Sequence, residues 1–187
     1  VQEIPDFVKL QKKYGNKIKV APALRDKKNQ KKLWQLLKNG DVDVTCSEHT
    51  PHEWETKNQP DMWKAQSGTP NIQESLPATL TNWVKQFGPD KLEQGLMTIA
   101  KTGSFNPAKI FGFKTKGKIA VGKDADLVII DPKSNWKVKK SGLFSKCGWS
   151  SYEGLTLNYN PIATYLRGNL VFSKGKIIGK PNGELIA

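Results

Sequence analysis

The chain has 187 residues, which is enough for one large domain or two small ones and long enough to bury a hydrophobic core. Its hydrophobic content is 37% and its mean hydropathy is −0.56, and no apolar run approaches the roughly 20 residues that cross a bilayer, which excludes a membrane-spanning protein. The formal net charge is +13, but the lysines are spread along the chain and flank apolar positions. This pattern favours a solvated, lysine-rich surface over a nucleic-acid-binding role.

The cysteines and the first residues bear on where the protein acts. Cys46 and Cys147 have no CxxC partner and are too few for a disulfide framework, so a reducing compartment such as the cytoplasm is predicted. Residues 1–6 lack the basic and apolar regions of a signal peptide, and the chain does not begin with Met. We therefore expect a fragment of a longer protein.

In chain order, the first part of the sequence predicts alternating helices and strands. Residues 5–15 have the pattern of the end of a helix, and residues 17–21 and 42–46 alternate polar and apolar side chains as short strands do. Between these strands, Asp26 can cap a helix that ends at Asn39 and Gly40. Strand, helix and strand form a βαβ unit, which belongs to parallel sheets with helices packed on their faces.

The next part predicts a long loop followed by helices. Residues 53–69 form a polar loop, and a loop of this length is commonly functional. Helices are expected over residues 71–87 and 90–101, and a short helix is expected to begin at Asn106 and to end at Gly112.

After residue 113 the sequence changes to short apolar runs separated by glycine-containing turns. This pattern predicts hairpins, and therefore a second, β-rich module. The expected strands are residues 118–121, 126–131, 136–138, 163–167 and 170–172.

The only two histidines of the chain, His49 and His52, fall in residues 47–52, directly after the expected strand over residues 42–46. In α/β proteins the C-terminal end of a strand is where ligands and chemistry are usually found. The residues alone leave two interpretations open. The segment is either part of a functional site or a polar loop whose histidines are solvated or cap the next helix.

Five segments resemble motifs of dihydroorotases and related cyclic amidohydrolases, in the same order along the chain. Residues 43–52, Asp-Val-Thr-Cys-Ser-Glu-His-Thr-Pro-His, resemble the motif that ends Asp-His-Ala-Pro-His, and residues 21–25, Ala-Pro-Ala-Leu-Arg, resemble Asn-Pro-Pro-Leu-Arg. Residues 104–112 are similar to the family's Asn-Pro-Ala-Lys helix, and residues 117–128 to the strand pair that opens its C-terminal β-sandwich. Residues 146–154 fit its late loop. Together these motifs cover nearly the whole chain.

The resemblance implies an α/β fold class. Residues 1–113 would be the C-terminal portion of a (β/α)8 metal-dependent hydrolase barrel, and residues 114–187 would be strands of a small β-sandwich domain. Such enzymes open a cyclic amide or ureide ring with one or two divalent metals, usually zinc, which lower the pKa of a bound water and polarise the carbonyl. A dihydroorotase would act in pyrimidine biosynthesis.

The resemblance also implies roles for individual residues. Glu48 stands where the family has an aspartate that touches the metal and moves a proton from water to the leaving nitrogen. His49 has no ligand role in the family and is interpreted as a supporting residue. The positions that contact substrate, by side chain or by loop backbone, map to His52, Ala21, Ser67 and Gly68.

Two of these positions depart from the dihydroorotase pattern. Glu48 adds a methylene to the family's aspartate, which moves the carboxylate by about 1 Å, and a misplacement of this size can cost ~10²-fold in rate. Ala21 replaces a substrate-binding asparagine, as a small residue often does in allantoinases, whereas residues 51–57 look dihydroorotase-like. Dihydroorotate, allantoin and hydantoin therefore all stay open as substrates.

The family's other metal ligands have no counterpart here. They are a His-x-His pair, a carboxylated lysine and two further histidines, all in the first half of the barrel, whereas this chain has only two histidines. A catalytic zinc site needs three protein ligands and a water, so the chain alone is expected to be inactive. We expect it to associate with the N-terminal half of the barrel or with itself as a homo-oligomer. A non-catalytic scaffold of the same family is the alternative of another class.

Overall fold

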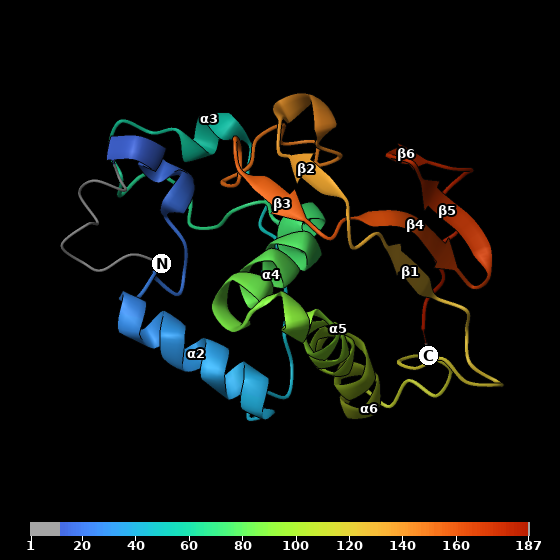
Figure 1. The fold of residues 1–187 in the computed structure, drawn as a ribbon. Coiled ribbons are helices and arrows are strands. Elements are labelled where there is room, and N and C mark those ends of the chain that lie inside the picture. Colours follow the sequence, from blue (N-terminus) through green and yellow to red (C-terminus); the bar gives the residue numbers. More distant parts are fainter. Residues whose placement is uncertain (1–11, 187) are drawn as a thin grey trace.

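Helices precede strands along the chain in the computed structural model, which describes residues 12–186. Helix α4 lies at the centre, with α2 on one side of it and the strands β1, β4, β5 and β6 on the other (Figure 1). The protein is therefore of mixed α/β class. The helices and strands are α2 (Lys27–Asn39), α3 (Trp54–Lys57), α4 (Ile72–Phe87), α5 (Leu92–Ala100), α6 (Asn106–Ile110), β1 (Leu127–Ile130), β2 (Asn135–Lys137), β3 (Thr156–Asn158), β4 (Pro161–Leu166), β5 (Asn169–Ser173) and β6 (Lys176–Ile177).

The expected caps of α2 are confirmed. The Asp26 side chain accepts a hydrogen bond from the Asn29 backbone N–H at 3.0 Å, and Gly40 ends the helix in the left-handed conformation with a φ of 85°. Both features stabilise helix ends through groups close in sequence, which is why the sequence predicts them well. Most of the helix predicted over residues 5–15 lies outside the described residues, although residues 12–14 are helical.

Trp83 forms the centre of the packing between the helices. It is completely buried on α4, and its ring packs against Phe87 at 4.8 Å and edge-on against Trp34 of α2 at 6.4 Å between ring centroids. A Cβ placed at Gly95 of α5 would lie 2.7 Å from the Trp83 ring, so the absence of a side chain there lets α5 approach α4 closely. The Trp83 indole N–H donates to the Lys91 carbonyl at 2.8 Å.

The strands predicted over residues 17–21 and 42–46 are wrong. Gly15–Ile18 forms a 3-10 turn, and residues 41–48 follow an irregular path. The second segment is instead held by helical residues, because the Thr45 N–H donates to the Thr102 carbonyl at 3.1 Å and the Asn106 amide donates to the Asp43 carbonyl at 2.8 Å. A strand requires a neighbouring strand to pair with, and the described residues place none beside either segment.

The C-terminal strands form two antiparallel sheets, a four-stranded sheet in the order β1-β4-β5-β6 and the pair β2-β3. The pair packs on α4 through the buried side chains of Ala78, Val138 and Leu157. The predicted strand over residues 118–121 is wrong, because this segment is a loop. Two short strands, β3 and β6, were not expected.

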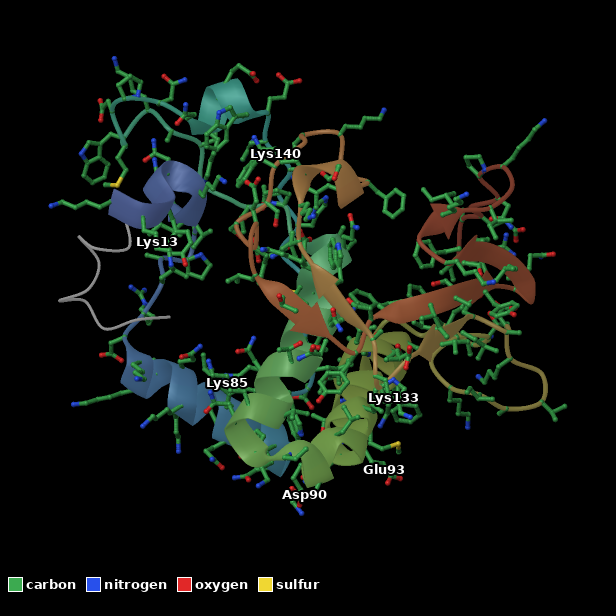
Figure 2. All side chains as sticks on the ribbon, turned by 45° about the horizontal axis from the view of Figure 1, so that its top comes forward. Lys13, Lys85, Asp90, Glu93, Lys133 and Lys140 are labelled. Atoms are coloured by element: carbon green, nitrogen blue, oxygen red, sulfur yellow. The ribbon has the colours of Figure 1, made fainter. Side chains whose placement is uncertain are left out.

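Exposed lysines occur on several elements rather than on one. The labelled residues Lys13, Lys85, Lys133 and Lys140 come from different segments and lie around the molecule (Figure 2). Among residues 12–186, no helix combines the length and the apolar character that crossing a membrane requires.

Candidate active site

A cavity of about 420 Å³ gathers residues from four separate parts of the chain. Its walls come from residues 17–24, from Glu48, from residues 68–71 and from Ser151 and Tyr152. The structure therefore brings together three of the predicted site residues, Ala21, Glu48 and Gly68. Neither His52 nor Ser67 lines this cavity.

Among residues 12–186, Glu48 is the only carboxylate on the cavity wall. Its backbone is left-handed, with a φ of 53°, a conformation that side chains other than glycine adopt infrequently. Its side chain is exposed and makes no hydrogen bond or ion pair with any of residues 12–186. The carboxylate is thus available to a ligand or to a group supplied from elsewhere.

His52 and Ser67 contact each other instead of the cavity. The His52 Nε2 lies 3.1 Å from the Ser67 carbonyl oxygen, and the His52 carbonyl accepts a hydrogen bond from the Trp149 indole N–H at 2.8 Å. His52 therefore links the segment after Glu48 both to the loop before Gly68 and to the late loop around Trp149.

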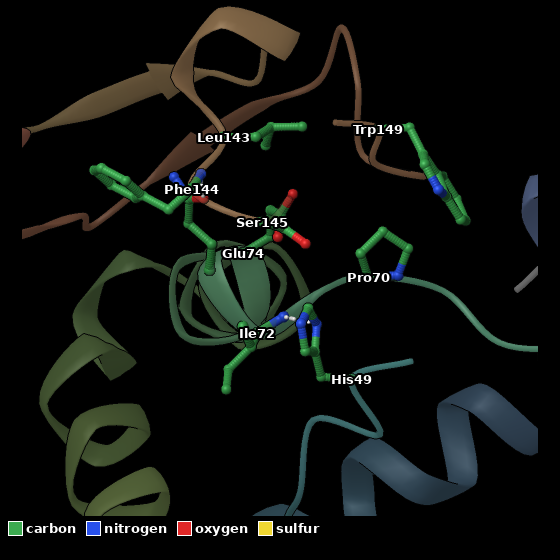
Figure 3. A pocket seen from close by; sticks show the side chains of 9 residues that line it. His49, Pro70, Ile72, Glu74, Leu143, Phe144, Ser145 and Trp149 are labelled. Atoms are coloured by element: carbon green, nitrogen blue, oxygen red, sulfur yellow. Dashed lines mark hydrogen bonds between the residues drawn. The ribbon is translucent and has the colours of Figure 1, made fainter. Parts of the chain in front are cut away.

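His49 caps a helix, which is one of the interpretations that the sequence leaves open. Its Nδ1 accepts hydrogen bonds from the backbone N–H groups of Asn71 at 3.0 Å and Ile72 at 3.2 Å, at the start of α4 (Figure 3). The side chain of Asn71, the N-cap residue, makes no capping bond of its own. The His49 ring thus takes the place of the cap by satisfying N–H groups that the first turn of a helix leaves unpaired.

Two cavity residues from the late loop were not predicted as site residues. The Thr69 hydroxyl donates to the Ser151 hydroxyl at 3.0 Å, so this contact joins two walls of the cavity. Burial, together with the negative charge of Glu74, raises the pKa of the Tyr152 hydroxyl, which therefore stays protonated in neutral solution. These residues lie about a hundred positions after Glu48, and only the similarity of residues 146–154 to a family loop pointed to them.

The described residues do not form a metal centre by themselves. No three side chains of His, Cys, Asp or Glu among residues 12–186 lie close enough to hold one ion. The His49 Nδ1 is engaged with α4, and the His52 Nε2 faces a carbonyl. Among residues 12–186, Glu48 is the one His, Cys, Asp or Glu side chain on the cavity wall, so these residues offer a single ligand of this kind rather than a complete set.

Comparison with known proteins assigns the family. Residues 5–171 match the model of the amidohydrolase family. The chain belongs to this family. Dihydroorotase from Pyrococcus horikoshii is 36% identical over 173 residues, which are 90% of this chain and 37% of that protein. L-hydantoinase from Paenarthrobacter aurescens is 35% identical over 167 residues (88% and 35%), and allantoinase from Arabidopsis thaliana is 35% identical over 173 residues (90% and 33%).

Solved structures agree with this assignment. The L-hydantoinase from Arthrobacter aurescens matches this amidohydrolase with a TM-score of 0.83 at 33% identity, over 92% of this chain and 38% of that one. The D-hydantoinase from a Thermus species matches with a TM-score of 0.77 at 29% identity, over 95% and 40%. The chain spans about a third of the length of the curated relatives that it matches. The expectation of a cyclic amidohydrolase family member is confirmed.

Proposed function

We propose that this chain is the C-terminal part of a metal-dependent cyclic amidohydrolase, dihydroorotase-like in activity, which opens a cyclic amide or ureide ring by hydrolysis. The observation that carries the proposal is the unpaired Glu48 carboxylate on the wall of a cavity that Ala21 and Gly68 also line. The dihydroorotase, hydantoinase and allantoinase relatives, all 35–36% identical, support the reaction class and leave allantoin and hydantoin as alternative substrates.

In this proposal Glu48 carries a proton. It accepts the proton from water as the water oxygen bonds to the ring carbonyl carbon, and it then delivers the proton to the ring nitrogen as the C–N bond breaks. Its position at the cavity wall, without a competing partner in the described residues, suits this role. Ala21 and the backbone at Gly68 would shape the space for the ring, and His52 would hold the Ser67 carbonyl next to it.

A divalent metal, zinc in the first instance, would lower the pKa of the attacking water and polarise the carbonyl when bound. This chain offers Glu48 as one oxygen ligand. The remaining ligands would come from the N-terminal half of the barrel, which makes that half the expected partner. Large apolar side chains on α5 and near α6 are exposed and would be covered by such a partner, in particular Met97, Ile110 and Phe111, which are 67%, 60% and 68% exposed. Association of identical chains into a homo-oligomer would also cover these apolar side chains.

The domain boundary belongs to the same proposal. Residues 1–113 would be the end of a (β/α)8 barrel, and residues 114–187 would be strands of a β-sandwich. The change from helices to antiparallel strands, between α6 and β1, supports this division.

The test uses the whole protein with dihydroorotate, allantoin and hydantoin, before and after treatment with a chelator. We expect turnover of at least one substrate and its loss on chelation. Glu48→Gln keeps the size of the side chain but removes its basicity, and is expected to lower kcat by about 10²-fold or more. The absence of turnover with all three substrates in the metal-loaded protein would contradict the proposal.

A non-catalytic scaffold is the alternative from another class. It is motivated by glutamate at the family's aspartate position and by Ala21 at the asparagine position. Glu48→Asp separates the two functions. A lower rate identifies Glu48 as the working acid and base, whereas a large gain identifies a degraded site that the aspartate restores.

A further inference from the structure

Lys57 is a buried cation that the proposed reaction does not use. Its side chain, on α3, is completely buried, yet no carboxylate of residues 12–186 forms an ion pair with it. A buried charge without a counter-ion is costly, so its hydrogen-bonding partners have to explain why it is there.

Those partners are backbone carbonyls in the two segments that lead to Ala21 and Gly68 on the cavity wall. The Lys57 Nζ donates to the Lys19 carbonyl at 2.5 Å and to the Gln66 carbonyl at 3.0 Å. Lys19 lies two residues before Ala21, and Gln66 lies two residues before Gly68. The Lys19 carbonyl also accepts the Gly68 N–H at 2.9 Å, so one oxygen joins Lys57 to both segments.

The late loop that carries Ser151 contacts the same ammonium group. The Lys57 Nζ lies 5.9 Å from the ring centroid of Trp149, within the range of a cation–π contact. Trp149 is 2% exposed, and it lies two residues before Ser151, which lines the cavity. Lys57 therefore contacts the segments that carry Ala21, Gly68 and Ser151.

A second lysine supports the same loop. The Lys19 Nζ donates to the carbonyls of Met62 at 2.8 Å and Ala65 at 2.5 Å. Carbonyl groups of the loop between α3 and α4 thus accept hydrogen bonds from the ammonium groups of Lys19 and Lys57. These hydrogen bonds fix the path of the chain up to Gly68.

We propose that Lys57 is a positioning residue, which sets the width of the substrate cavity by joining the Lys19 carbonyl, in the segment that carries Ala21, to the Gln66 carbonyl, in the segment that carries Gly68. This inference rests on the proposed function for its catalytic consequence, but its structural part stands without it. Burial and the neighbouring positive charge of Lys19 lower the pKa of Lys57 to about 8. Because burial disfavours the charged form of Lys57, its hydrogen bonds to the two carbonyls, rather than an ion pair, explain why a lysine occupies this position.

The test is Lys57→Met in the whole protein, with Lys64→Met as the matched control. Lys64 is an exposed lysine of the same loop, and its side chain makes no hydrogen bond or ion pair with any of residues 12–186. We expect Lys57→Met to raise KM about tenfold, with little change in kcat, because it loses two hydrogen bonds from a charged donor. A purely structural role would reduce the amount of folded enzyme, which lowers the apparent kcat and leaves KM unchanged.

Hydrogen exchange gives a readout that needs no substrate. In Lys57→Met the amides of residues 66–69 should exchange about tenfold faster, while those of α2 and the Lys64→Met control stay as in the wild type. If the wild type turns over no cyclic substrate, the proposed function fails and the exchange experiment alone decides the role of Lys57. If Lys57→Met does not fold, Lys57→Arg replaces it, and we expect the same changes because the larger planar group cannot keep the spacing of the two carbonyls. Values of KM and exchange rates within twofold of the wild type would overturn the inference.

Discussion

The N-terminal and C-terminal regions of the molecule find different hydrogen-bond partners for the backbone of their non-helical segments. In the C-terminal region the strands pair with one another, as β1-β4-β5-β6 and β2-β3. In the N-terminal region the irregular segments that lead to Ala21 and Glu48 pair with no strand among the described residues, and they are held by side chains, helix residues and loop carbonyls instead. The comparison indicates that the sheet region is held by strand pairing, with hairpins joining β4 to β5 and β5 to β6, whereas the segments at the candidate site are held by contacts other than strand pairing.

The largest expected effect tests whether the helical region has a core of its own. Trp83→Ala removes a completely buried ring between α2, α4 and α5, and is expected to destabilise the protein by about 3–5 kcal/mol. Trp63→Ala is the matched control, because that ring is 83% exposed, and it should change the free energy of unfolding by less than about 0.5 kcal/mol. Urea denaturation measures both. Equal effects would show that the helices are not organised around Trp83.

A smaller effect is expected where the site meets the helical core. His49→Ala removes the acceptor for two N–H groups at the start of α4 and should cost about 1 kcal/mol. Hydrogen exchange should rise at residues 71–74 and stay unchanged in α2, which serves as the internal control. Unchanged exchange at the start of α4 would mean that His49 does not act as its cap.

A substitution at Glu74 is expected to stabilise the protein, whereas the two preceding substitutions destabilise it. Its side chain is 3% exposed, and its Oε1 atom has no hydrogen-bond partner. Glu74→Gln keeps the volume and removes a buried charge, so we expect it to stabilise the protein by about 1 kcal/mol. Glu93→Gln, at an exposed position on α5, is the control and should have no measurable effect on the melting temperature. Destabilisation by Glu74→Gln would indicate that the carboxylate has a partner that the described residues do not supply.

The smallest effect belongs to the loop that leads into β1. Hydrogen bonds from Lys116 and Thr115 lower the pKa of Asp124 below its ordinary value. A carboxyl whose pKa is lower in the folded state stabilises the fold above its unfolded pKa, and this contribution is lost as the pH falls through the folded pKa. Asp124→Asn should therefore weaken the loss of stability below about pH 4, only slightly because the pair is partly exposed. An identical pH profile for variant and wild type would show that the ion pair contributes nothing.

Most helices could be predicted from the sequence because their signals are local. Asp26 and Gly40 delimit α2, and the apolar spacing of residues 71–87 and 90–101 gives α4 and α5. The strands over residues 17–21 and 42–46 were predicted from alternation, but alternation says nothing about whether a neighbouring strand exists. The strand prediction over residues 118–121 fails because this segment, too, has no neighbouring strand among the described residues.

The candidate site was predicted in part. The motif around Glu48, together with Ala21 and Gly68, pointed to three residues that do line one cavity. The contributions of Ser151 and Tyr152 could not be derived from local pattern, because they come from a loop about a hundred residues later. The buried state of Lys57 could not be predicted either, since a lysine between polar residues is ordinarily exposed.

The sequence by itself determined the family and the principal helices, because motifs and helix caps depend on neighbouring residues. The tertiary structure alone decided the role of each histidine and lysine at the site. His49 became a helix cap, His52 a contact of the Ser67 carbonyl, and Lys57 a donor to the Lys19 and Gln66 carbonyls. These roles depend on which backbone groups are left unpaired nearby, and that is fixed only when distant segments pack together.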